Sequence, residues 1–489
     1  MSRLRKISKF VVLMLENRSF DHVLGYSKKA NSSIDGIAGT DFNYEDPLKK
    51  QKKVYVRRAT ASALPFDPGH EFPDVKIQLY GPAVGGGANP PKKKAPMSGF
   101  VRSSAISGGK GANKVMECFE ADQLPVLTTL AAQFGVLNYW YSSMPGPTWP
   151  NRFFVHAGTS GGLTDSPGKM EAVRGFNFKN GTIYDRLAAA KLGWRIYHTD
   201  IPQVIGIRNV RKHYLSGYHF RHFDSFQDDV TAGDLPEYTF IEPHYDVFND
   251  FVNGNSMHPQ NDVAHGEKLV KDVYEAIRGA AIWDKTMLIV TFDEHGGFYD
   301  HNSPPTARST GDDTRYATKG LSFKFDRYGV RVPTIVVSAY TKAGTVIGKD
   351  SNDPNDVFDH CSILSTVGKR FGLASMTNRD KKANTLEALL NLDAGRKDAP
   401  AKLPKAKTPL RNFPAKALRA VGKRGVNKPL DKTQEAFLGL AIACDMELRG
   451  VSGRRSLAAL PAAPRTKGAA DKYAHNVQRR ILAQRSKSR

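Results

Sequence analysis

Six short apolar runs, rich in β-branched residues, constrain the fold of this chain more than any other feature of its sequence. They lack the polar alternation of half-exposed strands, which is typical of strands buried on both faces of a sheet. Between several of them, as in Asp122–Phe134 and Val263–Trp283, apolar residues recur at helical spacing. Alternating strands and helices predict an α/β fold with a largely parallel central sheet and helices on both faces. The runs are Phe10–Leu15, Gly135–Asn138, Arg195–His198, Tyr238–Ile241, Met287–Phe292 and Val332–Ser338.

The length of 489 residues suggests more than one unit, and the composition divides the chain near residue 397. Residues 1–397 contain all six runs and form the predicted main domain, in which Gly85–Pro96 is a flexible Gly/Pro/Lys-rich loop. Residues 398–450 are basic and Pro/Lys-rich, with one docked helix expected over Lys432–Arg449. Residues 451–489 are expected to form a basic, disordered tail.

The net charge of +23 is concentrated at the C-terminal end. Residues 401–489 contain 21 Lys and Arg against 5 Asp and Glu, a net charge of +16. Such a basic extension favours polyanions, which means either an anionic membrane surface or nucleic acid. A solvated appendage without a partner is the alternative interpretation.

The N-terminus begins with basic residues, and the apolar run after them stops at Glu16. That run is too short for a secretory signal, and no segment has the roughly 18 apolar residues that span a bilayer. The expectation for the chain as written is therefore a cytoplasmic location. The three cysteines, Cys118, Cys361 and Cys444, are widely spaced and predict neither a disulfide framework nor a metal site.

Two acidic clusters follow predicted buried strands. Glu16 and Asn17 come directly after the first run, and Asp293 and Glu294 come directly after the fifth. Functional groups of such folds collect at the carboxyl ends of strands. Carboxylate and amide oxygens suit hard divalent cations, and adjacent carboxylates repel one another unless a cation or proton neutralises them. The segment 293–301 also contains His295, Asp300, His301 and a Gly-Gly pair that permits close approach of the backbone to a ligand.

A third cluster surrounds Thr148 in the sequence PGPTWPNR, at residues 145–152. The flanking prolines restrict the backbone and fix how the Thr148 hydroxyl is presented. The planar fork of Arg152, four residues further on, is suited to holding phosphate oxygens. Taken alone, the spacing of this segment favours a proline-rich turn over a functional site.

Histidines form the fourth group. His258 precedes the long helical pattern that starts at Val263, His198 ends the third run, and His70 lies in the sequence DPGH. A lone histidine is more often structural than catalytic. Several at strand ends favour proton transfer near neutral pH and stabilisation of phosphoryl charge.

In order along residues 8–375, five motifs resemble the bacterial phosphatidylcholine-hydrolysing phospholipase C family. That family includes an acid phosphatase branch and the plant non-specific phospholipases C, and its fold resembles that of alkaline phosphatases and sulfatases. The motifs are ENRSFDHVLGY at 16–26, PTWPNRFF at 147–154, EPHYD at 242–246, HPQND at 258–262 and DEHGGFYDH at 293–301.

The resemblance implies a divalent metal ion, Ca²⁺, Mg²⁺ or Mn²⁺, since oxygen-rich ligands do not select among them. It implies Thr148 as the nucleophile, where the acid phosphatase branch is expected to use serine. His258 matches an active-site histidine, as do His70 and His198, and Asn151 and Arg152 fall within the nucleophile motif. The implied metal ligands are Glu16, Asn17, Asp293 and Glu294.

The resemblance predicts a phospholipase C-type phosphoesterase. It would hydrolyse glycerophospholipids to diacylglycerol and a phosphorylated alcohol through a phosphothreonine intermediate. Many members of the family resemble exported enzymes, in contrast to the cytoplasmic location expected for this chain. The serious alternative is a phosphomonoesterase of the acid phosphatase kind. A non-enzymatic polyanion-binding protein on the same scaffold is a third interpretation, and a sulfatase is disfavoured because residue 148 is neither Cys nor Ser.

Overall fold

An eight-stranded sheet forms the centre of the molecule in the computed structural model, which describes residues 2–83, 94–108, 111–312, 314–318, 321–407, 426–451 and 463–487. Neighbouring strands are parallel except where β12 lies between β11 and β6. The strands, in spatial order, are β13 (Thr345–Ile347), β6 (Gly135–Leu137), β12 (Thr334–Val337), β11 (Thr286–Phe292), β1 (Lys9–Leu15), β10 (Tyr238–Ile241), β8 (Trp194–His198) and β9 (Phe220–His222).

All six predicted runs are strands of this sheet, which confirms the predicted fold class. The two strands absent from the prediction, β9 and β13, are its edges. Each is three residues long and only partly buried, so neither needs the apolar run that marks a central strand.

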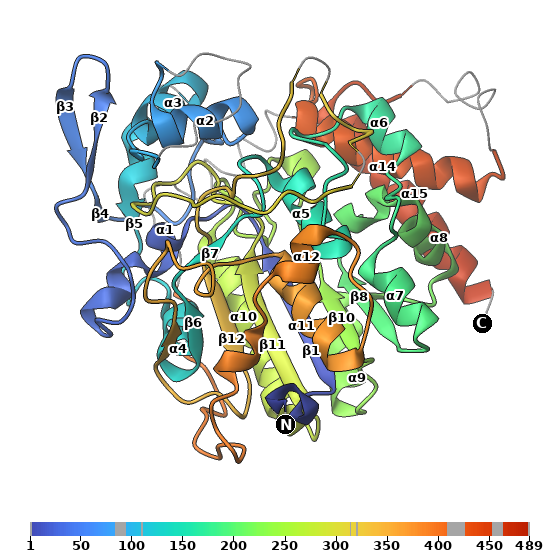
Figure 1. The fold of residues 1–489 in the computed structure, drawn as a ribbon. Coiled ribbons are helices and arrows are strands. Elements are labelled where there is room, and N and C mark those ends of the chain that lie inside the picture. The colour runs from blue at the N-terminus through green and yellow to red at the C-terminus, as the bar shows by residue number, and fades with distance from the viewer. Residues whose placement is uncertain are drawn as a thin grey trace.

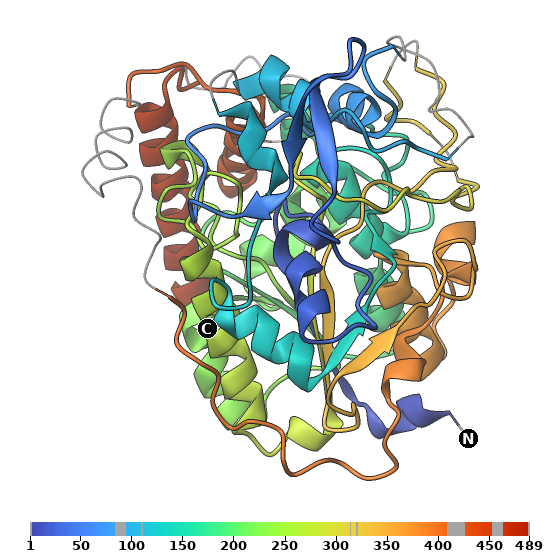
Figure 2. The same ribbon diagram turned by 90° about the vertical axis from the view of Figure 1, so that its left-hand side faces the viewer.

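Helices cover both faces of the sheet (Figure 1). Seen from the side, the yellow-green α10 and the orange α11 lie on opposite sides of it (Figure 2). α10 ends at Arg278, short of the predicted Trp283, because Gly279 follows. The helices are α1 (Phe20–Leu24), α2 (Phe72–Tyr80), α3 (Phe100–Gly108), α4 (Pro125–Gln133), α5 (Thr148–Ala157), α6 (Lys169–Arg174), α7 (Ile183–Ala189), α8 (Arg208–Ser216), α9 (Phe226–Thr231), α10 (Val263–Arg278), α11 (Cys361–Phe371), α12 (Asn378–Lys382), α14 (Lys432–Leu448) and α15 (Lys467–Lys487).

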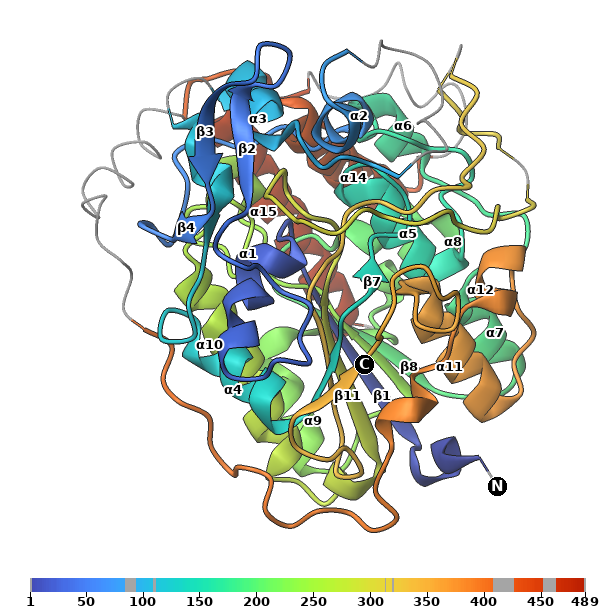
Figure 3. The ribbon, with the colours of Figure 1, turned by 60° about the vertical axis from the view of Figure 1, so that its left-hand side comes forward.

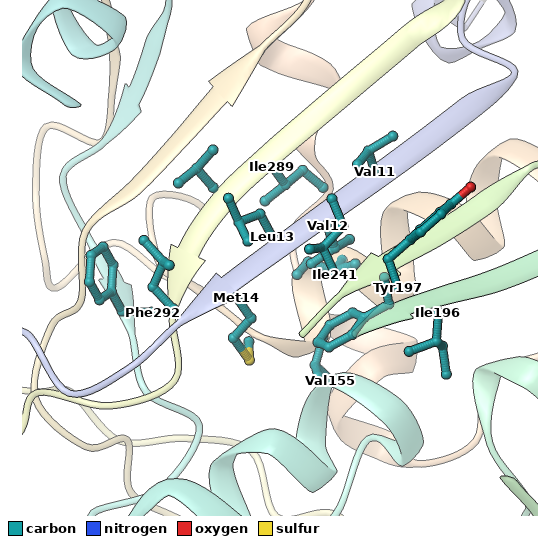
Figure 4. Close-up of a cluster of buried hydrophobic side chains, with 14 of the residues drawn as sticks. Val11, Val12, Leu13, Met14, Val155, Ile196, Tyr197, Ile241, Ile289 and Phe292 are labelled. Carbon is teal, nitrogen blue, oxygen red and sulfur yellow. The ribbon is translucent and has the colours of Figure 1, made fainter. Parts of the chain in front are cut away.

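The core is centred on β1, whose residues from Phe10 to Leu15 are fully buried. Figure 4 shows Val155 of α5 pointing toward the sheet near Met14. Every residue of α5 after Thr148 is buried as well. Close packing on all sides leaves such a helix little freedom to shift, so its first residue is held in a fixed position.

Three small sheets lie outside the central one, and a hairpin formed by one of them projects from the molecule (Figure 3). Among the described residues, no helix is long and apolar enough to cross a bilayer. The strand pairs are β2 (Phe42–Asp46) with β3 (Gln51–Tyr55), β4 (Arg57–Arg58) with β5 (Glu117–Cys118), and β7 (Trp140–Tyr141) with β14 (Phe358–Asp359).

The C-terminal part folds back onto the main domain through α14 and α15. The helix expected over Lys432–Arg449 corresponds to α14, and its Phe437 ring lies 5.9 Å from that of Trp149. Disorder was expected from residue 451, but Lys467–Lys487 form α15. Its buried side chains, spaced about one turn apart, include Ala470, Ala474, Val477 and Ile481. Most of the predicted Gly85–Pro96 loop, and residues 452–462 of the predicted tail, lie outside the described residues.

Candidate active site

The two acidic clusters meet because β1 and β11 are adjacent and parallel. Leu15 pairs with Phe292, so Glu16 and Asp293 leave neighbouring strands at the same level. The backbone N–H of Asn17 donates to Asp293 Oδ1 over 3.0 Å. Asn17 adopts φ +58°, a left-handed conformation that asparagine tolerates better than most residues. The predicted approach of the two clusters at one sheet edge is therefore observed.

Gly296 allows the loop after β11 to reach Asn17. Its φ is +64°, and a Cβ atom there would lie 2.1 Å from the Asn17 carbonyl oxygen. Its N–H donates to Glu294 Oε2 over 2.7 Å, which fixes that carboxylate. The Gly-Gly pair was predicted to allow close approach to a ligand. Here Gly296 instead accommodates the backbone of the opposite acidic cluster.

Thr148 lies at the first position of α5, with its side chain half-buried. Its hydroxyl donates to Asn17 Oδ1 over 3.1 Å, which links the proline-rich segment to the acidic residues. The first N–H groups of a helix have no partner within it, and Pro150 has no N–H at all. The Thr148 oxygen is thus next to N–H groups that favour a bound anion.

Asn151 holds the turn that presents Thr148. Its amide nitrogen donates to the carbonyl oxygens of Met144, Gly146 and Pro147 at 2.8–3.2 Å, and its oxygen accepts from the N–H of Met144. The Asn151 side chain is fully buried in these contacts. It therefore holds the segment that presents Thr148.

The four predicted metal ligands are all buried, and their oxygens are of the kind that divalent cations prefer. Glu16, Asn17, Asp293 and Glu294 are at most 3% exposed, and within the described residues Glu16 Oε2 and Glu294 Oε1 have no hydrogen-bond partner. Burial raises the pKa of Glu16 well above its usual value, and it raises the pKa of Asp293 to about 6 despite Arg152. Ionised carboxylates are costly in such surroundings, and a cation bound among them would offset that cost.

Arg152 supports this set from the protein side. Its Nε donates to Asp293 Oδ2 over 2.9 Å, and its Nη2 donates to the carbonyl oxygens of Met14 and Leu15. The guanidinium is completely buried. Arg152 was predicted to hold phosphate oxygens, but its fork binds the Asp293 carboxylate and the end of β1 instead, because α5 points this side chain into the sheet.

We expect Arg152→Met to lower the free energy of unfolding by about 3–5 kcal/mol, since it leaves buried carboxylates without their counter-charge. Urea unfolding monitored by tryptophan fluorescence, in the presence of chelator, measures this loss. The matched control is Arg58→Met, because Arg58 makes ion pairs with Glu120 and Asp122 at the surface. That variant should change stability by less than about 1 kcal/mol. Equal losses in the two variants would refute a structural role for the Arg152 charge.

His70 and His258 lie on either side of one carboxylate, Asp67. His258 Nε2 is 3.5 Å from Asp67 Oδ2, and His70 Nδ1 is 3.7 Å from Asp67 Oδ1. Burial opposes protonation of His70, but Asp67, Glu294 and Glu71 together raise its pKa to about 10. Asp67 was not among the predicted site residues. A carboxylate three residues before a histidine was the available signal.

Arg18 links the segment that contains His258 to the loop that contains Glu16 and Asn17. It donates to the carbonyl oxygens of Met257 and His258 at 2.7 and 3.1 Å. The N–H of Glu16 donates to the Ser256 carbonyl oxygen over 2.8 Å. These hydrogen bonds join the loop before α10 to the loop after β1. Glu294 is then close enough to His70 to contribute to the rise in the pKa of that histidine.

His198 makes its contacts with a different group of residues. Its ring packs against Tyr214 and Phe220, 5.3 and 6.0 Å away, and its Nδ1 is bonded to the carbonyl oxygen of Asp200. Burial and the charge of Arg485 lower its pKa to about 3. Within the described parts of the chain, no hydrogen bond or ion pair joins His198 to another predicted site residue.

The segment 293–301 divides between two sites. Asp300 and His301 join Asp21 in a second acidic cluster, where their ligand atoms lie within 4.8 Å of one another. The buried guanidinium of Arg331 donates to Asp300 Oδ1 over 2.9 Å and to Asp21 Oδ1 over 3.2 Å. A cation of the protein itself therefore already neutralises this cluster.

The chain matches a known protein family over most of its length. The profile of the Phosphoesterase family matches residues 7–374. Non-specific phospholipases C1 and C6 of Arabidopsis thaliana are 38% and 39% identical, over 84% and 81% of this chain and 76% and 75% of theirs.

A non-hemolytic phospholipase C of Pseudomonas aeruginosa is 26% identical over 76% of this chain and 54% of its own length. A solved alkaline phosphatase superfamily protein from Vibrio parahaemolyticus aligns with 53% of this chain and 63% of its own at a TM-score of 0.30. The extent of the family match and the identity to the plant proteins show the class of this chain. It belongs to the Phosphoesterase family and is a phosphoric ester hydrolase.

Proposed function

We propose that this protein is a phospholipase C-type enzyme that cleaves glycerophospholipids to diacylglycerol and the phosphorylated head group, with Thr148 as nucleophile. The observation that carries the proposal is the Thr148 hydroxyl, held on Asn17 at the start of a buried helix and next to four acidic or amide ligands. The phospholipase names of the Arabidopsis and Pseudomonas relatives support the substrate class.

In the first step the Thr148 hydroxyl gives up its proton to solvent and its oxygen forms a bond to phosphorus. The bond from phosphorus to the diacylglycerol oxygen breaks, and that oxygen takes a proton. The product is a phosphothreonine that still carries the head group. Water then attacks the same phosphorus and loses a proton, the bond to Thr148 breaks, the threonine oxygen regains a proton, and the phosphorylated head group leaves. The rigid setting of α5 fixes the direction of the first attack.

The ligand set of Glu16, Asn17, Asp293 and Glu294 would hold a divalent cation. When bound, such an ion stabilises the deprotonated threonine and the charge on phosphoryl oxygens. Arg152 favours the ionised form of Asp293 and fixes the orientation of its carboxylate. The N–H groups at the start of α5 add a second source of positive potential for the phosphoryl group.

His70 and His258 are the proposed proton carriers. The departing diacylglycerol oxygen needs a proton, and an imidazolium paired with Asp67 is a suitable donor. The Nδ1 of His70 is bonded to the Pro68 carbonyl oxygen, so Nε2 is the atom left to face a substrate. Asp67 acts through both rings and is a positioning residue.

We expect Asp67→Asn to move the alkaline limb of the pH profile of kcat/KM to lower pH by at least about one unit. The carboxylate raises the pKa of His70, so the group stays protonated up to about pH 10 and loses its proton earlier without Asp67. Initial rates with a soluble substrate between pH 6 and 11 measure the shift. Asp122→Asn, a surface carboxylate paired with Arg58, is the control. An unchanged alkaline limb in Asp67→Asn would remove His70 as the acid.

The reaction class is tested by assaying phosphatidylcholine and p-nitrophenyl phosphate in parallel, with and without a chelator. We expect faster turnover of the diester and loss of both activities in chelator. A large preference for the monoester would favour the phosphomonoesterase alternative, which uses the same nucleophile and cation. A panel of phospholipids with different head groups extends the same assay to selectivity.

A further inference from the structure

The β2–β3 hairpin carries an aromatic surface that packs on nothing else in the described structure. Phe42 pairs with Tyr55 and Tyr44 pairs with Lys53 across the two strands, so these four side chains share one face. The opposite face is attached to the protein: Asn43 donates to the Met97 carbonyl oxygen and accepts from the N–H of Phe100.

The Phe42 ring lies against both tyrosine rings. Phe42 lies 5.2 Å from Tyr44 and 5.6 Å from Tyr55, and Lys53 Nζ is 4.3 Å from the centre of the Phe42 ring. Tyr55 is 50% exposed. Within the described residues, none of these rings belongs to a buried core cluster or has a hydrogen-bond partner.

The tip of the hairpin adds an aliphatic side chain and a dense positive charge. Leu48 is 66% exposed, the largest value but one among the exposed large hydrophobic residues described. Residues 47–53, with the sequence PLKKQKK, contain four lysines and no acidic residue. Glu45 and Asp46, just before this segment, form exposed ion pairs with Lys52 and Lys49.

This surface stands at the active end of the molecule. Figure 1 shows the hairpin at the end toward which β1 and β11 run, opposite to the N-terminus. β3 continues through β4 to Asp67 and His70, and β4 pairs with β5. The Glu117 carbonyl oxygen of β5 is bonded to His22, six residues after Glu16. The hairpin is therefore connected on both sides to segments that carry site residues.

We propose that this hairpin face, with its tip, docks the enzyme on an anionic phospholipid surface. Aromatic rings partition to the region between head groups and hydrocarbon, an exposed leucine enters the hydrocarbon, and lysines bind anionic head groups. The proposal deepens the proposed function and rests on it for the substrate that the docked site would meet.

A lipid surface fits these residues better than nucleic acid does. Bases stack on open ring faces, but Phe42 is packed by Tyr44, Tyr55 and Lys53, and an aliphatic tip contributes little to stacking. The basic C-terminal extension is less suited in its described part, because several of its cations are engaged within the protein. Arg480 pairs with Asp445, and Lys467 pairs with Asp250.

The test uses two hairpin variants of the full chain in a Thr148→Ala background, so that vesicles are not consumed. One is K49E/K50E/K53E and the other is L48S/Y55S. The matched control is K179E/K191E/K212E. It makes the same change in net charge at three exposed lysines, of which Lys179 and Lys191 flank α7 and Lys212 lies in α8. Binding is measured by sedimentation with vesicles of phosphatidylcholine containing phosphatidylserine, and with vesicles of phosphatidylcholine alone. Unchanged thermal unfolding shows that each variant is folded.

We expect the charge variant to bind the anionic vesicles at least about ten-fold more weakly than the control, which should bind like its parent. The apolar variant should lose affinity for both vesicle types. Equal binding of parent, hairpin variants and control would overturn the proposal, as would an equal loss in the control. It would also be overturned if the hairpin variants lost affinity for an oligonucleotide while keeping it for vesicles.

The same hairpin substitutions, made with Thr148 intact, separate docking from chemistry. Hydrolysis of a monomeric short-chain phosphatidylcholine should stay within about two-fold of the parent, and hydrolysis of vesicles should fall with binding. Absence of turnover of both substrates by the parent would refute the proposed function, whereas the binding measurements judge the docking surface alone. A parallel fall on the monomeric substrate would overturn the docking role.

Discussion

Thr148→Ala should lower the turnover of phosphatidylcholine by at least about 10⁴-fold, because it removes the oxygen proposed to form the bond to phosphorus. The fold should survive, since the hydroxyl makes one described hydrogen bond, to Asn17 Oδ1. Loss of one such bond costs about 1 kcal/mol. Steady-state assays with soluble substrate and a thermal melt measure the two effects.

Thr148→Ser is the matched variant, because it keeps an oxygen at the same position of α5. It should retain measurable turnover, reduced by the freer rotation of a side chain without the γ-methyl group. Acid quenching during turnover, followed by mass spectrometry, should find the phosphorylated head group on the peptide containing residue 148. Residual turnover above about one per cent in Thr148→Ala would exclude a covalent role for this residue.

Removal of divalent cations should abolish turnover and destabilise the protein. At a free cation concentration a hundred times its Kd, binding contributes about 2.7 kcal/mol to the free energy of unfolding. Thermal melts in chelator, and after titration with Ca²⁺, Mg²⁺ or Mn²⁺, measure this contribution and rank the ions. The effect should be largest for the ion that also restores activity.

Two substitutions identify which acidic cluster binds the ion. Glu294→Gln should remove the stabilisation by cation, because it neutralises a carboxylate whose Oε1 has no other partner. Asp300→Asn should leave that stabilisation intact, because Asp300 is already paired with Arg331. The reverse outcome would move the metal site to the cluster of Asp21, Asp300 and His301.

Much of the scaffold could be predicted from the sequence, for a physical reason. Central strands of a parallel sheet are apolar on both faces, so their runs are visible without a partner, and polar residues directly after them must lie at one edge. The proximity of Glu16 and Asp293 could be predicted for this reason. The edge strands β9 and β13 could not, because their half-exposed residues carry no comparable signal.

The direction in which individual side chains point was harder to predict from the sequence. The sequence places Arg152 four residues after Thr148, on the next turn of the same helix, but which face of α5 meets the sheet depends on the whole core. Asp67 gains its importance from His258, which is distant in sequence. Half of the side chains that α15 buries in the described structure are alanines, Ala470 and Ala474, so its stability comes from its docking site and not from a strong apolar pattern.

The packing of Phe437 has a consequence for any shortened version of this protein. Its ring closes over Trp149, the residue after Thr148, and over Tyr245, whose hydroxyl donates to Glu242. A chain that ends at residue 397 lacks Phe437. The indole of Trp149 would then be exposed to water, and the ring of Tyr245 would lose a packing partner. Truncation at this boundary would therefore remove packing that supports the start of α5, where Thr148 lies.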